Sequence, residues 1–160
     1  MNKRNQLLKQ AVSMKRIVIF LLFTFHFLTS FAQSGLNIAP LFEGKVIPQQ
    51  RMVETRVKGK MLSKYQLTFF RSIRFEATSK SEITRVHDLI ELDKKKYSGS
   101  AYAENYSSEK SRSKETLMLQ LPKQGNQNRF LCYKRNGEEI TVVYMEGSLN
   151  SIETLKELIK

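Results

Sequence analysis

The sequence predicts an α+β fold, an antiparallel sheet of about four to five strands with two main helices packed on one face. Three observations predict this fold. Short segments with apolar residues at alternate positions recur along the chain, which is typical of strands with one buried face. Two other segments repeat apolar residues every three or four positions, which is typical of amphipathic helices. Asn136-Gly137 lies between two strand-like segments and predicts a hairpin.

The N-terminal 32 residues have the pattern of a secretory signal. Lys15 and Arg16 precede an apolar run at 17–28, and Ser-Phe-Ala at 30–32 places small residues where a signal peptidase reads them. The run is about a dozen residues long, short of the roughly 20 that a permanent membrane span requires. We therefore predict a cleaved export signal, with a buried core helix as the alternative interpretation of the run.

The predicted cleavage falls after Ala32, so that the mature chain begins at Gln33. Met14 directly precedes the basic pair, and we expect it to be the true start. Residues 1–13 are then either a gene-model extension or a lengthened first part of the signal. Removal of residues 1–32 takes away five basic residues and no acidic residue, so the net charge falls from +12 to +7.

The cysteine content and the length of the chain set further bounds. Cys132 is the only cysteine, so no intramolecular disulfide can form, and no cysteine at the cleavage site can accept a lipid. We expect a periplasmic or secreted protein without a permanent membrane span. The 128 residues after the predicted signal suit one domain. An arm at 33–51 precedes an α+β domain at 52–160, which carries a mobile loop at 98–113.

The first elements of the mature chain are expected to be an arm and two strands. Residues 33–51 contain two prolines and enough apolar residues to lie across the domain, either extended or with one helical turn near Pro40. Residues 52–60 alternate as a half-exposed strand. The next residues suit either one long strand or a helical turn at 61–66 that leads into a strand at 68–78, and the second interpretation is favoured.

The helix that follows has the most regular pattern in the chain. Ser79 or Ser81 can cap its start, and Glu82 places negative charge in the first turn. Three lysines at 94–96 end it, where positive charge is favourable. The predicted apolar stripe consists of Ile83, Val86, Leu89, Ile90 and Leu92.

Three strands are expected after the serine-rich loop. Residues 117–121 alternate as a strand that Pro122 stops. Strands at 130–135 and 140–145 flank Asn136-Gly137, which suits a type I′ turn because both turn positions need positive φ.

A second main helix closes the chain. It is expected to begin at Ser148 or Asn150. Its apolar stripe consists of Ile152, Leu155, Leu158 and Ile159. Because the two helices bracket the three-stranded meander, we expect both to pack on the same face of the sheet.

The residues that commonly carry catalysis form no recognisable constellation. His87 is accompanied by no His-x-x-x-His or Cys-x-x-Cys motif and by no clustered carboxylates, so we predict a boundary or core histidine and no metal site. Cys132 alternates with Phe130 as a small buried hydrophobe, and an inert thiol is favoured over a thiol–imidazole pair. Glu138 and Glu139 point to opposite faces and cannot work as an acid–base pair. We predict no cofactor and no enzymatic activity.

Basic and aromatic residues around the serine-rich loop form the candidate binding site. Its members are Lys94, Lys95, Lys96, Tyr97, Tyr102, Tyr106, Lys110 and Arg112. Basic side chains interleaved with aromatic ones can hold an anionic glycan, a lipid head group or an acidic protein. The simpler interpretation is a solvated helix end followed by a soluble loop. Export argues against nucleic acid as the partner.

Three stretches carry a resemblance to a known group of proteins. They are the signal ending in SFAQ, the strand-like LTFFRSIRFEAT, and the terminal ITVVYMEGSLNSIETLKELI. Together they resemble small exported proteins of unknown function of the gut Bacteroidota type. The resemblance implies export and a compact α+β domain, and it brings no functional residues.

Three functions are carried forward. The leading hypothesis is an exported, non-enzymatic envelope or secreted protein that binds an envelope protein or an anionic glycan. The alternative is a hydrolase or transferase with an unrecognised site, for which a cleft containing His87 or Glu76 would be the sign. A structural or inhibitory role would instead predict a flat polar surface with a wide apolar rim.

Overall fold

The computed structural model describes Gln33 and residues 35–97, 103–105 and 114–159. Gly35–Lys160 forms one compact unit. The predicted signal, with Ala32 at its cleavage site, lies outside the described residues. None of the helices in the described ranges has the length and apolar content that crossing a membrane would require.

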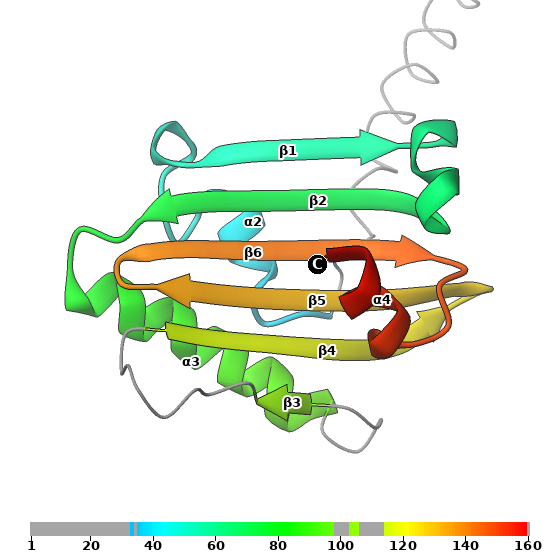
Figure 1. Ribbon diagram of the computed structural model, residues 1–160. Coiled ribbons are helices and arrows are strands. Elements are labelled where there is room, and N and C mark those ends of the chain that lie inside the picture. The colour runs from blue at the N-terminus through cyan, green and yellow to red at the C-terminus, as the bar shows by residue number, and fades with distance from the viewer. Residues whose placement is uncertain (1–32, 34, 98–102, 106–113, 160) are drawn as a thin grey trace, which may run out of the picture. The chain divides into compact units, whose positions relative to one another are not determined.

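A single antiparallel sheet of six strands forms the centre of this unit (Figure 1). In spatial order the strands are β1 (Val53–Lys58), β2 (Leu67–Glu76), β6 (Glu139–Gly147), β5 (Gln127–Asn136), β4 (Lys114–Gln124) and β3 (Ala103–Asn105). Five of them match the predicted strand segments. The sixth, β3, pairs with β4 inside the stretch predicted to be a loop, with Ala103 opposite Leu119. The α+β class is confirmed, with one strand more than predicted.

One face of the sheet, called the covered face, packs against the arm and the helix α3 (Lys80–Tyr97). The arm contains α2 (Ala39–Phe42), the helical turn predicted near Pro40, and the short η3 (Gln49–Arg51). Its side chains Leu36, Ile38, Leu41, Phe42 and Ile47 are all buried. They share this core with Ile73, Leu119, Leu131, Ile140 and Val142 of the sheet and with Val86 and Ile90 of α3.

The other face, called the open face, packs against η4 (Lys60–Tyr65) and the C-terminal helix α4 (Ile152–Ile159). Leu62, Ile152 and Leu155 form a cluster here with Phe130 and Met145 of the sheet. Figure 1 shows α4 in front of the sheet and α3 behind it. The prediction that both main helices pack on one face is therefore wrong. The arm and α3 already fill the covered face, and the apolar side chains of the open face need a cover of their own.

The start of α3 has the capping arrangement that its sequence predicts. The hydroxyl of Ser79 accepts a hydrogen bond from the Glu82 amide at 3.2 Å, and the Glu82 carboxylate accepts one from the Thr78 amide at 2.9 Å. These bonds satisfy backbone donors that the first turn of a helix leaves free. Of the two serines considered, Ser79 is the cap.

The buried stripe of α3 differs from the prediction at one turn. Leu92 belongs to the predicted stripe, but 50% of its surface is exposed. Asp93 takes the buried position instead, three residues after Ile90. The stripe thus ends on a carboxylate, which must find partners inside the protein.

Two turns differ in detail from their predictions. The hairpin between β5 and β6 forms where predicted, but Asn136 is paired with Glu139, and only Gly137 of the turn has positive φ, at 67°. This is the pattern of a type II′ turn, which needs a glycine at its first central position. Pro122 does not stop its strand, because β4 continues to Gln124 through an irregularity after Leu121. Proline is tolerated at such bulges.

Candidate functional site

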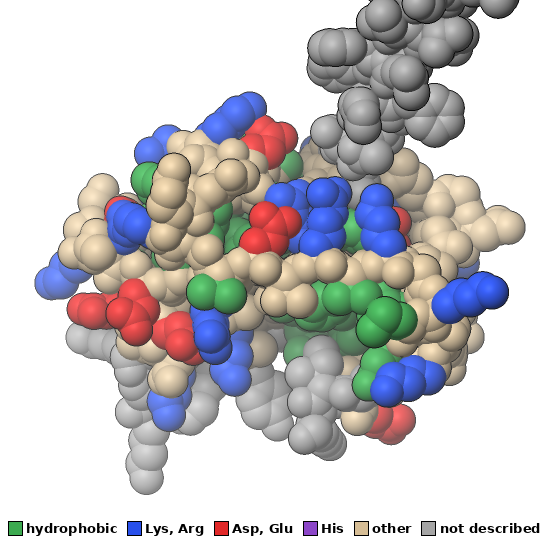
Figure 2. All heavy atoms as spheres, turned by 90° about the horizontal axis from the view of Figure 1, so that it is seen from above, with side chains coloured by type: hydrophobic (Ala, Val, Ile, Leu, Met, Phe, Trp, Pro, Cys, Tyr) green, Lys and Arg blue, Asp and Glu red, His purple; other side chains and the backbone are tan. Residues whose placement is uncertain are grey.

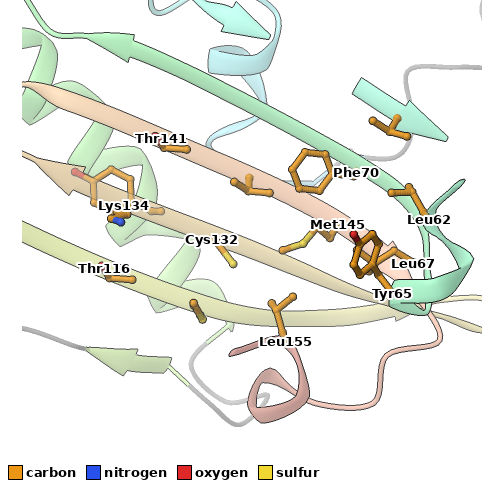
Figure 3. A pocket seen from close by; sticks show the side chains of 14 residues that line it. Leu62, Tyr65, Leu67, Phe70, Thr116, Cys132, Lys134, Thr141, Met145 and Leu155 are labelled. Atoms are coloured by element: carbon orange, nitrogen blue, oxygen red, sulfur yellow. The ribbon is translucent and has the colours of Figure 1, made fainter. Parts of the chain in front are cut away.

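The open face carries an apolar groove with a volume of about 490 Å³ (Figure 3). Its floor is built by side chains from five neighbouring strands, and its walls come from the segments that flank the sheet. The floor consists of Val57, Phe70, Met118, Cys132, Val143 and Met145. The groove is therefore a concave apolar surface on a rigid sheet, the usual form of a small-molecule site.

Strand register explains why these side chains come together. Met118 lies opposite Cys132, which lies opposite Val143, so these three form one row across β4, β5 and β6. Residues two positions along a strand point to the same face, and the next row places Met145 beside Phe70. Two adjacent apolar rows thus run across the sheet.

The walls of the groove come from η4 and α4. Leu62 and Tyr65 of η4 line one end, and Leu155 of α4 overhangs the floor from the side (Figure 3). Gln66, which links η4 to β2, has a left-handed backbone with φ at 57°. Gly147 passes so close to Gln66 that any Cβ there would collide with the Gln66 carbonyl oxygen. The narrow contact brings the end of β6 and the wall-forming η4 together.

A polar row lies at the opposite end of the groove. Thr116, Lys134 and Thr141 face one another across β4, β5 and β6 (Figure 3), and Arg74 of β2 continues the row beside Thr141. Arg74 and Lys134 are exposed. Their backbones lie about 10 Å apart, the width of two strand spacings. The groove therefore leads from an apolar floor to a row with two positive charges.

The acidic residues of the next row limit where an anion can lie. Glu76 is opposite Glu139 at the far ends of β2 and β6. Glu76 lies two residues beyond Arg74 on β2, and Glu139 lies two residues before Thr141 on β6, so both belong to the same face as Arg74 and Lys134. An anionic group is favoured beside Arg74 and Lys134 and disfavoured beyond them.

Cys132 lies in the floor of the groove with 8% of its surface exposed. Burial raises the pKa of its thiol to about 12, so the thiol stays protonated at neutral pH. His87 contacts Glu115, which is three residues from Met118 on β4 and so belongs to the opposite face. The two residues of the disfavoured thiol–imidazole pair are thus separated by the sheet.

The edge strand β1 separates two kinds of surface. Figure 2, which looks down on this edge, shows Lys, Arg, Asp and Glu side chains on one side of the strand and hydrophobic side chains on the other. The alternation of β1 accounts for this pattern. Glu54, Arg56 and Lys58 belong to one face, and Val53 and Val57 to the other.

The predicted basic and aromatic segment is only partly described. Lys94 is paired with Glu91 at 3.0 Å. Lys96 and Tyr97 both donate hydrogen bonds to the carbonyl oxygen of Gly35, at 2.6 and 2.9 Å. Lys95 lies on the exposed side of the same helix end. Tyr102, Tyr106, Lys110 and Arg112 lie outside the described residues, so the segment as a binding site stays a prediction.

A buried carboxylate holds the arm onto the covered face. Asp93 accepts hydrogen bonds from the backbone amides of Asn37 and Ile38 at 2.7 and 2.9 Å, and from the Asn37 side chain at 3.0 Å. These amides immediately precede α2, where a carboxylate also complements the helix dipole. This role was not predicted from the sequence, although Asp93 continues the apolar stripe at helical spacing.

A second anchor joins the arm to the start of α3. Both terminal nitrogens of Arg51 donate to the Glu82 carboxylate, at 2.6 and 2.9 Å. These bonds, together with the Thr78 amide, lower the pKa of Glu82 to about 2. A bidentate pair of this kind fixes geometry as well as charge.

The covered face also contains a small hydrogen-bonded cluster of polar side chains at its end. The Tyr144 hydroxyl donates to Glu146 at 2.6 Å and accepts from Arg129 at 2.8 Å. Burial raises the pKa of Tyr144. Glu138 and Glu139 are exposed at the hairpin, as predicted. None of these groups lines the groove.

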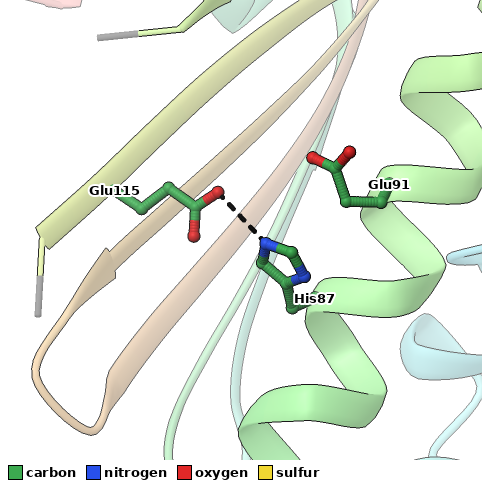
Figure 4. A group of neighbouring side chains, drawn as sticks. All are labelled: His87, Glu91 and Glu115. Carbon is green, nitrogen blue, oxygen red and sulfur yellow. Dashed lines mark ion pairs between the residues drawn. The ribbon is translucent and has the colours of Figure 1, made fainter. Parts of the chain in front are cut away.

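His87 has two carboxylate neighbours that were not predicted from the sequence (Figure 4). Glu91 lies four residues further along α3, and Glu115 lies at the start of β4. One ligand atom from each of the three residues falls within 4.8 Å of the others. The expectation that no carboxylates accompany His87 is wrong. The i,i+4 spacing to Glu91 was a visible signal, but Glu115 is brought in by tertiary packing.

Comparison with models of protein families gives one match. A model described as a family of unknown function (DUF6108) matches residues 25–159. The chain belongs to this family. The membership agrees with the resemblance to proteins of unknown function, while export and an origin in Bacteroidota stay predictions. No curated protein and no solved structure gives a significant match to this DUF6108 member.

Proposed function

We propose that this protein is an exported, non-enzymatic binding module that holds the acyl chain of an anionic amphiphile in the groove of the open face. The observation that carries the proposal is the apolar floor of the groove, which leads into the row of Lys134 and Arg74. An acyl chain would lie along Phe70, Met118 and Val143. A carboxylate or phosphate head group would lie beside the two cations.

The size and polarity of the groove support a small ligand with an apolar body. A volume of about 490 Å³ is within the usual range of ligand sites, roughly 300–1,000 Å³. Thr116, Thr141 and Lys134 are concentrated at one end. A glycan would need polar partners along its whole length, which the apolar floor does not offer.

The sheet itself disfavours an extended peptide as the occupant. The floor strands β5 and β6 are central in the sheet, and their backbone groups are already bonded to neighbours on both sides. A peptide lying over the floor would bury its own amides and carbonyls without partners, at about 1–3 kcal/mol for each group. An acyl chain has no such groups.

The protonated state of Cys132 supports a non-enzymatic role. With a pKa of about 12, this thiol is a poor nucleophile at neutral pH. The signal-like segment before Gln33 supports export, since its basic pair, apolar run and small residues occur in the order that secretion requires.

Titration with a dansyl-labelled fatty acid, followed by displacement with palmitate, tests the proposal. Val143→Lys places a charge in the floor, and Val53→Lys places the same charge on the same face outside the groove. We expect saturable binding to wild type and to Val53→Lys, and binding at least about ten-fold weaker to Val143→Lys. Circular dichroism confirms that each variant is folded.

The head-group contribution is tested separately. Lys134→Ala should weaken palmitate more than hexadecanol, whereas Lys58→Ala, on the covered face, should affect neither. No saturable fatty-acid binding, or equal binding by Val143→Lys and Val53→Lys, would overturn the proposal. So would tight binding of an apolar helical peptide without any binding of lipid.

A further inference from the structure

Figure 4 shows the cluster of His87, Glu91 and Glu115. It lies on the far side of the sheet from the groove, because Glu115 and the groove residue Met118 alternate on β4. His87 and Glu91 project from successive turns of α3, and Glu115 projects from β4 toward them. The Nε2 atom of His87 is 3.5 Å from Oε1 of Glu115. The three residues therefore come from two different elements that pack against each other.

These distances suit the ligands of a small divalent cation. Metal–nitrogen and metal–oxygen bonds of about 2.0–2.2 Å at tetrahedral angles place neighbouring ligand atoms roughly 3.4 Å apart. His87 and Glu115 already have this separation. Glu91 completes the group within 4.8 Å, so a rotation of its side chain brings it into bonding range.

The burial of the cluster allows a cation to enter while keeping the ligands in place. The exposed fractions of the side chains are 39% for His87, 32% for Glu115 and 28% for Glu91. Each side chain is thus largely packed against the protein, with one side open to solvent. A water molecule can complete the coordination at this opening.

Two neighbouring groups support the assignment. Oδ1 of Asp88 is 4.0 Å from Nδ1 of His87, on the opposite side of the ring from Glu115. At this distance the two atoms are not hydrogen-bonded, and Asp88 adds negative charge beside the imidazole. The hydroxyl of Tyr133 is buried and has no hydrogen-bond partner among the described residues, and Glu115 is one of the charged groups that act on it. This buried hydroxyl lies within the electrostatic influence of both Glu115 and Arg135.

The local charge also favours a cation. Glu91, Glu115 and the nearby Asp88 bring three carboxylates around one imidazole, against two cations: Lys94, which pairs with Glu91 at 3.0 Å, and Arg135, which lies opposite Glu115 on β5. A bound cation would replace the Lys94 ammonium as the partner of Glu91. The Lys94–Glu91 pair is an i,i+3 pair on one helix, and pairs of this kind contribute little to stability, so the exchange costs little.

We propose that His87, Glu91 and Glu115 bind a divalent transition-metal cation such as Zn²⁺, with water as a further ligand, and that the cation fastens α3 to β4. An imidazole with two carboxylates suits Zn²⁺ better than Mg²⁺ or Ca²⁺, which prefer oxygen ligands alone. The site is independent of the groove, because the two lie on opposite faces of the sheet.

Calorimetric titration of the untagged protein with Zn²⁺, Mg²⁺ and Ca²⁺ tests this proposal, together with the melting temperature in each metal. We expect one Zn²⁺ per chain, a higher melting temperature with Zn²⁺ alone, and affinity reduced at least about ten-fold in His87→Ala and Glu115→Gln. The control is Glu54→Gln, which removes a carboxylate elsewhere on the protein and should bind Zn²⁺ like wild type.

Circular dichroism of the variants without metal separates loss of binding from loss of folding. Absence of saturable Zn²⁺ binding to wild type would overturn the proposal. The cluster would then consist only of the ion pairs His87–Glu115 and Lys94–Glu91. Equal affinity in Glu115→Gln and Glu54→Gln would also overturn it. Neither result depends on whether a fatty acid binds in the groove.

Discussion

The two faces of the sheet are built from the same strands and are covered in different ways. The covered face packs against α3 and an arm whose apolar residues are buried, and Asp93 and Arg51 tie that arm down through specific hydrogen bonds. The open face packs against α4 and η4 at its sides, and Phe70, Met118 and Val143 stay half-buried between them. Side chains that alternate along the same strands thus form a closed core on the covered face and an accessible apolar surface on the open face.

The largest expected difference concerns the reactivity of Cys132, which tests how deeply its thiol is buried in the floor of the groove. With a pKa of about 12, its thiolate fraction at pH 8 is about 10⁻⁴, against roughly a quarter in an unfolded chain. Alkylation by iodoacetamide should therefore be slower in the native protein by a factor on the order of 10³. Similar rates with and without urea would mean that the Cys132 thiol is not buried in the folded protein.

Core truncations on the two faces compare their contributions to stability directly. Ile73 is fully buried on the covered face, so Ile73→Ala should lower the free energy of unfolding by about 3–4 kcal/mol. Val143 is only half-buried on the open face, so Val143→Ala should cost about 1 kcal/mol or less. Urea denaturation measures both. Equal losses would remove the distinction between the faces.

The anchor of the arm is tested by Asp93→Ala. The change leaves the buried amides of Asn37 and Ile38 without an acceptor, and we expect a loss of about 2–3 kcal/mol in unfolding free energy. Asp88→Ala, on the exposed side of the same helix, should cost less than about 0.5 kcal/mol. If the two variants are equally stable, the arm is not held by this carboxylate.

The smallest expected effect is the pH dependence of the Arg51–Glu82 pair. The folded-state pKa of Glu82, about 2, is below the ordinary value of 4.5, so its contribution to stability is present above pH 4.5 and is lost as the pH falls toward 2. Glu82→Gln should therefore be less stable than wild type at pH 6, and the difference should shrink over this range. Glu138→Gln, at the exposed hairpin, is the charge-matched control. A difference that stays constant from pH 6 to pH 2 would contradict the assignment.

Local pattern predicts most of the elements of this fold. Alternation located five strands, the spacing of Val86 and Ile90 located α3, and Gly137 located a hairpin, since each signal depends on residues close in the sequence. The face on which α4 packs could not be predicted from local pattern. It depends on tertiary packing, because the arm and α3 already fill the covered face. The strand end predicted at Pro122 was wrong for a similar reason, because a bulge after Leu121 accommodates the proline and the strand continues.

The candidate sites were predicted less well than the fold. Phe70, Met118 and Val143 each interrupt the alternation of their strands with an apolar residue on the wrong face, and this was a readable sign of the open face. The meeting of Glu115 with His87 depends on the packing of β4 against α3 and had no local signal. The residues proposed from sequence at 94–112 remain a hypothesis of their own.

Methyl NMR during a palmitate titration tests most directly the claim that one face is structural and the other binds. The account predicts saturable shifts of the Met118, Met145 and Val143 methyls on the open face, while those of Ile73 and Ile140 on the covered face stay in place. Shifts of equal size on both faces, or none on either, would contradict it.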